Sequence, residues 1–266
     1  MNKESYPNPW QCVWLFFRII IIFGMFLFLT LTLPQFFNIQ LSPVYYSIIS
    51  TIAPFLWIPI ILFVQKESGM KLNLSLDFPH LRTVILLIIL VISTKIITNP
   101  LYNITVSIKY LIEGRLKIDN LELLEFNFSL IVRFIGLVFV VPIFEEIFWR
   151  RQILVLFLNK YSPSFAVVLS SLLFAIGHLK FNSIIALLIW GLLFGIIYYQ
   201  TQSLGATIFA HSLCNFLDFF TKHEFIYLTT SNIIINFLCF ISSLASLFFI
   251  IRYLDHQRKK IANEQT

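Results

Sequence analysis

The sequence predicts an all-α fold, a polytopic integral membrane helical bundle of about eight transmembrane helices. Its 266 residues are 58% hydrophobic and only 12% charged, and the mean hydropathy of +0.86 is far above that of an average soluble domain. The apolar residues are gathered into long runs, and a helix needs about 20 of them to cross a hydrocarbon core of roughly 30 Å. We therefore expect a single membrane domain over residues 1–266.

The eight predicted spans differ in how sharply their ends are marked. Four lie between charged or turn-forming residues, at 13–33, 44–64, 83–98 and 232–251. Four more begin at about Phe128, Ser164, Ser183 and Leu204, separated by short polar breaks at 159–163, 180–182 and 201–203. The first run is too long for a secretory signal and has no small-residue cleavage site, so we expect a retained helix.

The distribution of lysine and arginine predicts the orientation in the membrane. With eight alternating spans, eleven cations fall on the side of the amino terminus and five on the other, and cytoplasmic loops carry the excess of positive charge. The eleven are Lys3, Lys66, Lys71, Arg82, Arg150, Arg151, Lys160, Arg252, Arg258, Lys259 and Lys260. Both termini are therefore predicted to be cytoplasmic, and the net charge of +6 indicates a lipid bilayer and no nucleic acid as partner. The composition is typical of a bacterial plasma membrane protein.

Ionisable residues inside apolar spans are the candidates for function. A charge in the bilayer centre costs at least about 2.5 to 3.5 kcal/mol. Of thirteen acidic residues and five histidines, only five lie inside apolar runs, namely Glu145, Glu146, Asp218, His178 and His211.

The two adjacent glutamates are predicted to differ in role. Glu146 precedes Arg150 by four residues, the better orientation for a helical ion pair. Glu145 points about 100° away around the helix and is left free to face another helix. Pro142 removes the helical partner of the Val138 carbonyl and predicts a kink just before the pair.

The histidines are predicted to join the glutamates from two other helices. His178 lies 33 residues after Glu145, and the midpoint falls in the turn NKYSP, so a tight antiparallel hairpin places the two side chains at the same depth. In AHSLCNFLDFF, the residues His211, Asn215 and Asp218 share one helical face. Together these groups offer a general base and hydrogen-bond donors to an oxyanion.

Three motifs resemble a known family. EEIFWR fits Glu-Glu-x-x-x-Arg, FAIGH fits Phe-x-x-x-His and HSLCN fits His-x-x-x-Asn, in the order found in the CAAX prenyl protease type II and bacteriocin-processing (CPBP, Abi-like) intramembrane peptidases, over residues 128–220. The resemblance implies a peptidase of glutamate type without a cofactor, acting on a membrane-associated protein or peptide. Glu145 and His178 would activate water, His211 and Asn215 would stabilise the oxyanion, and Glu146 with Arg150 would support them. Many family members have glycine where this chain has Arg151.

Other interpretations of the same residues stay open. Glu145, His178 and His211 are also three potential zinc ligands with water in the fourth position, although no His-Glu-x-x-His helix is present. A non-catalytic immunity or scaffold protein would use the same cavity to hold a peptide. A proton-coupled transporter is disfavoured because no inverted repeat is apparent. Asp218 is predicted to be interfacial, and Lys95 to snorkel or form an ion pair.

Overall fold

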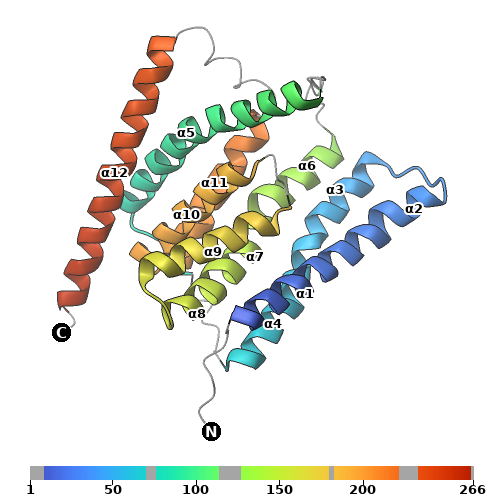
Figure 1. Ribbon diagram of the computed structural model, residues 1–266, viewed down its shortest axis with the longest axis horizontal. Helices are drawn as coiled ribbons and strands as arrows, with labels where there is room; N and C mark the ends of the chain where they lie inside the picture. The colour runs from blue at the N-terminus through green and yellow to red at the C-terminus, as the bar shows by residue number, and fades with distance from the viewer. Residues whose placement is uncertain (1–8, 70–75, 114–126, 180–182, 222–232, 265–266) are drawn as a thin grey trace.

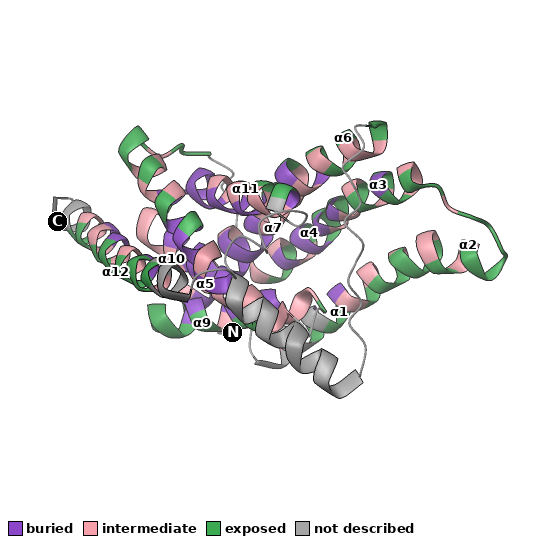
Figure 2. Cartoon of the chain, turned by 90° about the horizontal axis from the view of Figure 1, so that it is seen from above, coloured by how far each residue is buried: buried purple, intermediate pink, exposed green. Residues whose placement is uncertain are grey.

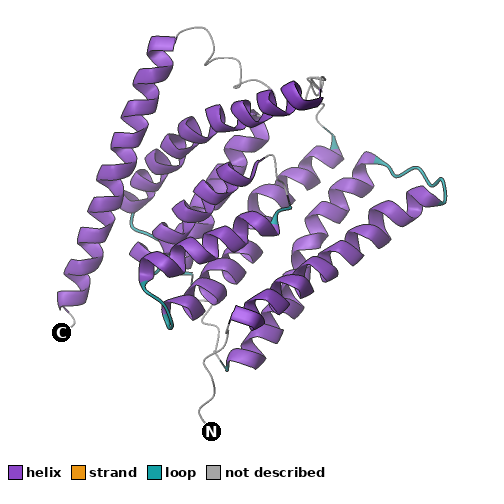
Figure 3. Ribbon diagram, viewed as in Figure 1, coloured by secondary structure: helices purple, strands orange, loops and turns teal. Residues whose placement is uncertain are grey.

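The computed structural model describes residues 9–69, 76–113, 127–179, 183–221 and 233–264. Within these ranges every regular element is helical (Figure 3), which confirms the predicted fold class. The elements join into eight continuous helical rods: α1 to α2 (Pro9–Leu27, Phe28–Thr32, Leu33–Phe36), α3 to α4 (Pro43–Ile52, Ala53–Leu56, Trp57–Ser68), α5 (Leu81–Glu113), α6 to α8 (Phe128–Ile135, Gly136–Val140, Val141–Glu146, Ile147–Leu154, Val155–Leu158), α9 (Pro163–Gly177), α10 (Ile184–Thr201), α11 (Leu204–Thr221) and α12 (Ile233–Glu264).

The helix ends carry the residues that favour helix termination and capping. The Ser42 hydroxyl accepts a hydrogen bond from the Tyr45 N–H at the start of α3, and Asn127 caps α6 in the same way. Such side chains satisfy N–H groups that have no partner in the first turn. Gly69 ends α4 with a φ of 67°, a left-handed conformation that glycine adopts without strain.

Five of the rods contain a stretch long and apolar enough to span a membrane: Phe17–Phe36, Pro43–Ser68, Leu81–Thr98, Phe128–Leu158 and Ile184–Thr201. The apolar helices Pro163–Gly177 and Leu204–Phe220 are shorter than the roughly 20 residues a span needs. His178 directly follows the first of these helices, and His211 lies within the second. Both helices lie in the middle of the bundle (Figure 1). The described start of α1 and end of α12 lie at the same end of the bundle, while the cytoplasmic assignment of that end stays a prediction.

Burial separates the lipid-facing helices from the helices that enclose the site. In Figure 2 the buried residues gather in α7, α9, α10 and α11, whereas α1 and α2 are largely exposed. On this exposed rod Trp14 is 62% and Phe36 81% accessible, values that suit contact with acyl chains and would be costly in water. The central helices therefore form the rigid surroundings in which polar groups can be held.

Two glycines bring α10 close to α9. A Cβ atom on Gly191 would lie 3.0 Å from the Ser171 carbonyl oxygen, and one on Gly195 would lie 3.1 Å from the Val167 side chain. Small residues four apart allow membrane helices to approach closely. This contact fixes α9, whose carboxyl end carries His178, against the centre of the bundle.

A third glycine, Gly136, lets the rod α6 to α8 pack on α3. A Cβ atom at this position would lie 2.9 Å from the Thr51 Cβ and 3.1 Å from its Cα. The Thr51 hydroxyl donates to the Val132 carbonyl at 3.1 Å and to the Ser47 carbonyl at 2.9 Å, so the threonine is not free to turn away.

We expect Gly136→Ala to lower the free energy of unfolding by about 1–3 kcal/mol, the usual cost of overpacking. The measurement is thermal unfolding in detergent. Gly24→Ala is the matched control, because a Cβ atom on this helical glycine meets nothing within 4 Å and alanine is the better helix former. Equal melting temperatures for the two variants would contradict the assigned contact.

Candidate active site

The rod Phe128–Leu158 carries both glutamates and is wound irregularly around them. Two segments, Gly136–Val140 and Ile147–Leu154, are π-helical, with hydrogen bonds between residues five apart. They lie on either side of the glutamates, and such widened turns are frequent at functional sites. The Val141 N–H bonds to the Gly136 carbonyl five residues back. In the same register the Leu137 carbonyl would need a hydrogen from residue 142, which is proline and has none.

The side chain of Asn215 fills this gap in the backbone. Its Nδ2 donates to the Leu137 carbonyl at 2.9 Å, which ties α11 to the glutamate-bearing rod. From the sequence we expected the carbonyl without a helical partner to be that of Val138, because α-helical hydrogen bonds join residues four apart. In the π-helical turn the bonds join residues five apart, so the side chain of Asn215 satisfies the Leu137 carbonyl instead. The carboxamide nitrogen retains a second hydrogen that this bond does not use.

Glu146 lies at the centre of a buried charged cluster. Arg150 Nε donates to Glu146 Oε2 at 3.0 Å, and both side chains are completely buried, as the spacing of four residues predicts. His211 Nδ1 lies 2.8 Å from the other carboxylate oxygen, Oε1. Glu146 therefore joins the arginine on its own rod to the histidine on α11, and its two oxygens have one partner each.

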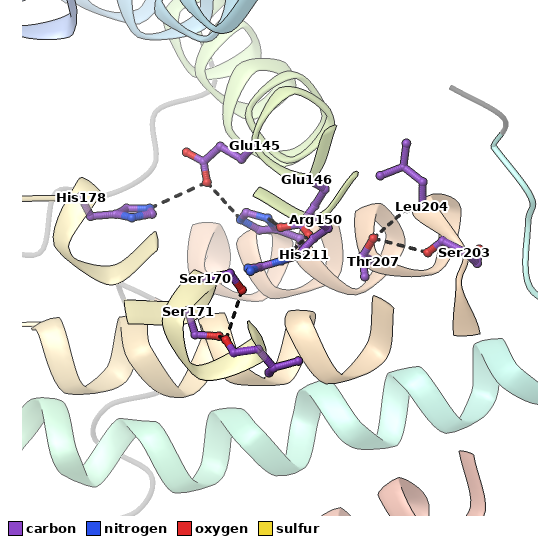
Figure 4. Close-up of polar contacts among 11 residues, drawn as sticks. Glu145, Glu146, Arg150, Ser170, Ser171, His178, Ser203, Leu204, Thr207 and His211 are labelled. Carbon is purple, nitrogen blue, oxygen red and sulfur yellow. Dashed lines mark hydrogen bonds and ion pairs between the residues drawn. The ribbon is translucent and has the colours of Figure 1, made fainter. Parts of the chain in front are cut away.

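Glu145 lies between two imidazole rings (Figure 4). Its Oε2 lies 3.8 Å from His178 Nε2 and 4.0 Å from His211 Nε2. These separations exceed a direct hydrogen bond. In the described part of the chain this buried oxygen accepts no hydrogen bond.

The hydrogen bonds at Nδ1 define what the two rings can do at Nε2. His178 Nδ1 lies 2.8 Å from the Phe174 carbonyl, and His211 Nδ1 faces the Glu146 carboxylate. Both partners are acceptors, so each Nδ1 carries a hydrogen. Each Nε2 is consequently an acceptor when its ring is neutral and a donor when its ring is protonated.

Two phenylalanines hold these polar side chains in place. The Phe174 ring contacts His178 at 4.6 Å between centroids and lies 5.0 Å beneath the Arg150 guanidinium. The Phe194 ring stacks on His211 at 4.6 Å with an interplanar angle of 20°. Phe174 belongs to the Phe-x-x-x-His motif, whereas Phe194 lies on α10 among many apolar residues, and nothing in the sequence marks it as part of the site.

The other polar residues considered from the sequence lie around this cluster. Asp218 pairs with Lys95 of α5, and its side chain is 35% accessible, which agrees with a position near the edge of the bundle. Arg151, the departure from the family pattern, donates through Nη1 to the Tyr198 hydroxyl at 2.7 Å. Both contacts link neighbouring helices, and neither involves Glu145.

The spatial arrangement thus joins Glu145, Glu146, Arg150, His178 and His211 in one cluster and attaches Asn215 beside it. Among the described residues, no group of three or more His, Cys, Asp or Glu side chains has the arrangement of a metal site. The chemistry available is that of a carboxylate and two imidazoles around one small space.

Residues 127–217 match the family described as type II CAAX prenyl endopeptidase Rce1-like. The matched segment begins one residue before α6 and contains all three motifs. No curated protein and no solved structure gives a significant match to the chain. The family consists of membrane proteases that act on membrane-associated proteins. Residues 127–217 are therefore similar to the Rce1-like family, consistent with the CPBP resemblance of the motifs, and they lie within an integral membrane protein of helical fold.

Proposed function

We propose that the chain is an intramembrane endopeptidase of glutamate type that hydrolyses a peptide bond in a membrane-associated protein or peptide. One observation carries this proposal: the Glu145 Oε2 atom has no hydrogen bond in the described structure and faces the Nε2 atoms of His178 and His211 at 3.8 and 4.0 Å. A contact of this length between polar groups suits one bridging water molecule, which is the co-substrate of hydrolysis.

Glu145 acts as the general base in this reaction. It takes a proton from the water while His178 Nε2 accepts the other hydrogen and orients the lone pair. The water oxygen adds to the carbonyl carbon, and the carbonyl oxygen becomes an oxyanion. When the C–N bond breaks, Glu145 returns the proton to the leaving amine, so that the carboxylate is restored. A positioned general base of this kind typically contributes a factor of about 10² to 10⁴.

His211 and Asn215 stabilise the oxyanion. The carboxylate of Glu146 accepts from His211 Nδ1 and fixes the ring so that Nε2 faces Glu145. In the protonated ring Nε2 is a charged donor. Asn215 offers the second hydrogen of Nδ2, the first being fixed on the Leu137 carbonyl. Donors held in place before the reaction lower the barrier most. Glu146 and Arg150 act through His211 and are positioning residues.

The surroundings are proposed to be a bacterial plasma membrane with both termini in the cytoplasm. The chemistry of the site does not depend on whether the substrate carries a prenyl group, so substrates of both kinds belong in the assay. Two alternatives use the same residues: zinc held by Glu145, His178 and His211, and a protein that binds a peptide without cleaving it.

The test is proteolysis by the purified protein in liposomes, with a quenched prenylated peptide and an unprenylated peptide library. Wild type is compared with Glu145→Ala and His178→Ala, each with and without a strong chelator. We expect cleavage by wild type that survives the chelator, and loss of cleavage in both variants, because each removes a group that holds the water.

Each other outcome selects an alternative. Loss of wild-type activity with the chelator, restored by zinc, would favour the metal-dependent mechanism. A folded wild type that cleaves nothing, together with variants that retain the cellular phenotype, would favour the non-catalytic binder. Cleavage that persists in Glu145→Ala would overturn the assigned base.

A further inference from the structure

The carboxyl-terminal part of α12, the helix at one edge of the bundle in Figure 1, carries an open groove of about 430 Å³. It is lined by Phe248, Phe249, Arg252, Asp255, His256 and Lys259. These residues recur every three or four positions, so they share one face of the helix. Along that face the side chains change from aromatic to cationic.

The span predicted from the sequence at residues 232–251 places this change at the membrane surface. The helix has 32 residues, about 48 Å at 1.5 Å per residue, which is longer than the roughly 30 Å hydrocarbon core. With residues 232–251 as the predicted span, the later turns project from the bilayer, and the charged residues follow Ile251. Phe248 and Phe249, which are 57% and 69% accessible, lie one turn inside Arg252.

The contacts described for Arg252 and Lys259 in the groove are with residues of α12 itself. Arg252 lies over the Phe248 ring at 5.5 Å. Lys259 has a 65% accessible side chain, and within the described residues it forms one ion pair, with Asp255 Oδ2 at 2.7 Å. By contrast, Arg258 turns toward the bundle and lies 4.2 Å over the Tyr199 ring of α10. The exposed donors of the groove are thus those of Arg252, His256 and Lys259.

One acidic group opposes these cations. The hydrogen bond from Lys259 holds the pKa of Asp255 below its ordinary value, so Asp255 stays ionised at neutral pH and offsets one positive charge. Gln200 of α10 also faces this carboxylate, at 3.5 Å. The remaining balance is positive, which is complementary to a single anionic group.

We propose that this groove binds an anionic phospholipid, with its acyl chain beside Phe248 and Phe249 and its phosphate between Arg252 and His256. The continuous change from apolar to cationic lining matches a molecule with one apolar and one anionic part. Basic residues just outside a span attract anionic lipids of the cytoplasmic leaflet. A lipid bound in this groove would therefore also favour the predicted orientation, with the carboxyl terminus in the cytoplasm. This site is independent of the proposed peptidase activity.

The test is native mass spectrometry of the full chain with phosphatidylglycerol and phosphatidylcholine of identical acyl chains. We expect a preference for phosphatidylglycerol that falls about fivefold in Arg252→Gln, the value of one cation at a membrane surface. Asp255→Asn should raise the preference, because it removes the opposing charge. Phe249→Ala should weaken binding of both lipids and leave the preference unchanged.

Lys66→Gln is the matched control, since Lys66 is an exposed lysine in the last turn of α4, outside the groove. Equal binding of the two lipids by wild type would overturn the proposal. An equal loss of preference in Lys66→Gln and Arg252→Gln would also overturn it, by showing a diffuse effect of surface charge. Displacement of the lipid by glycerol phosphate alone, with no effect of Phe249→Ala, would contradict the role of the aromatic part.

Discussion

Glu145→Gln is expected to lower kcat for peptide cleavage by a factor of about 10² to 10⁴, the usual contribution of a positioned general base. Glutamine keeps the size of the side chain but cannot take a proton from water. KM should change little, because the lost interaction belongs to the transition state. The measurement is steady-state cleavage of the quenched peptide by matched amounts of folded protein.

The same variant is expected to keep the stability of wild type. The Oε2 atom of Glu145 accepts no hydrogen bond within the described ranges, so the substitution breaks none there. Glu67→Gln, at the exposed end of α4, is the control for loss of a carboxylate and should retain full activity. A Glu145→Gln protein with most of the wild-type kcat would exclude this residue as the base.

Arg150→Leu is expected to destabilise the fold by about 3–5 kcal/mol, the cost of leaving one member of a buried ion pair uncompensated. Arg150 and Glu146 are both fully buried and bonded at 3.0 Å, so water cannot replace the lost charge. The melting temperature in detergent and the yield of monodisperse protein should both fall. Glu146→Leu should have a similar effect, because it leaves the guanidinium unpaired.

The double variant Glu146→Leu/Arg150→Leu separates stability from catalysis. Replacing both members of a buried pair by apolar residues is often neutral or stabilising, so its melting temperature should return toward that of wild type. Its activity should nevertheless be lost, because His211 Nδ1 no longer faces a carboxylate. Recovery of activity along with stability would show that the pair is purely structural and has no influence on His211.

The sequence by itself determined the fold class and several local relations. Long apolar runs separated by polar breaks are sufficient to predict membrane helices, because burial of backbone groups in lipid leaves few alternatives. The pairing of Glu146 with Arg150 followed from a spacing of four residues. The approach of Glu145 to His178 followed from their equal distances along the chain from one turn. This turn lies between the end of α8 at Leu158 and the start of α9 at Pro163.

Only the tertiary structure decided how the third helix of the site is rotated. The face of α11 that carries His211 was evident, but its contact with both glutamates depends on packing between elements distant in the sequence. The same is true of Phe194, which stacks on His211 from α10, and of the widened turn that gives the Leu137 carbonyl to Asn215. Periodicity defines which residues share a face, whereas the side chains of neighbouring helices determine what that face meets.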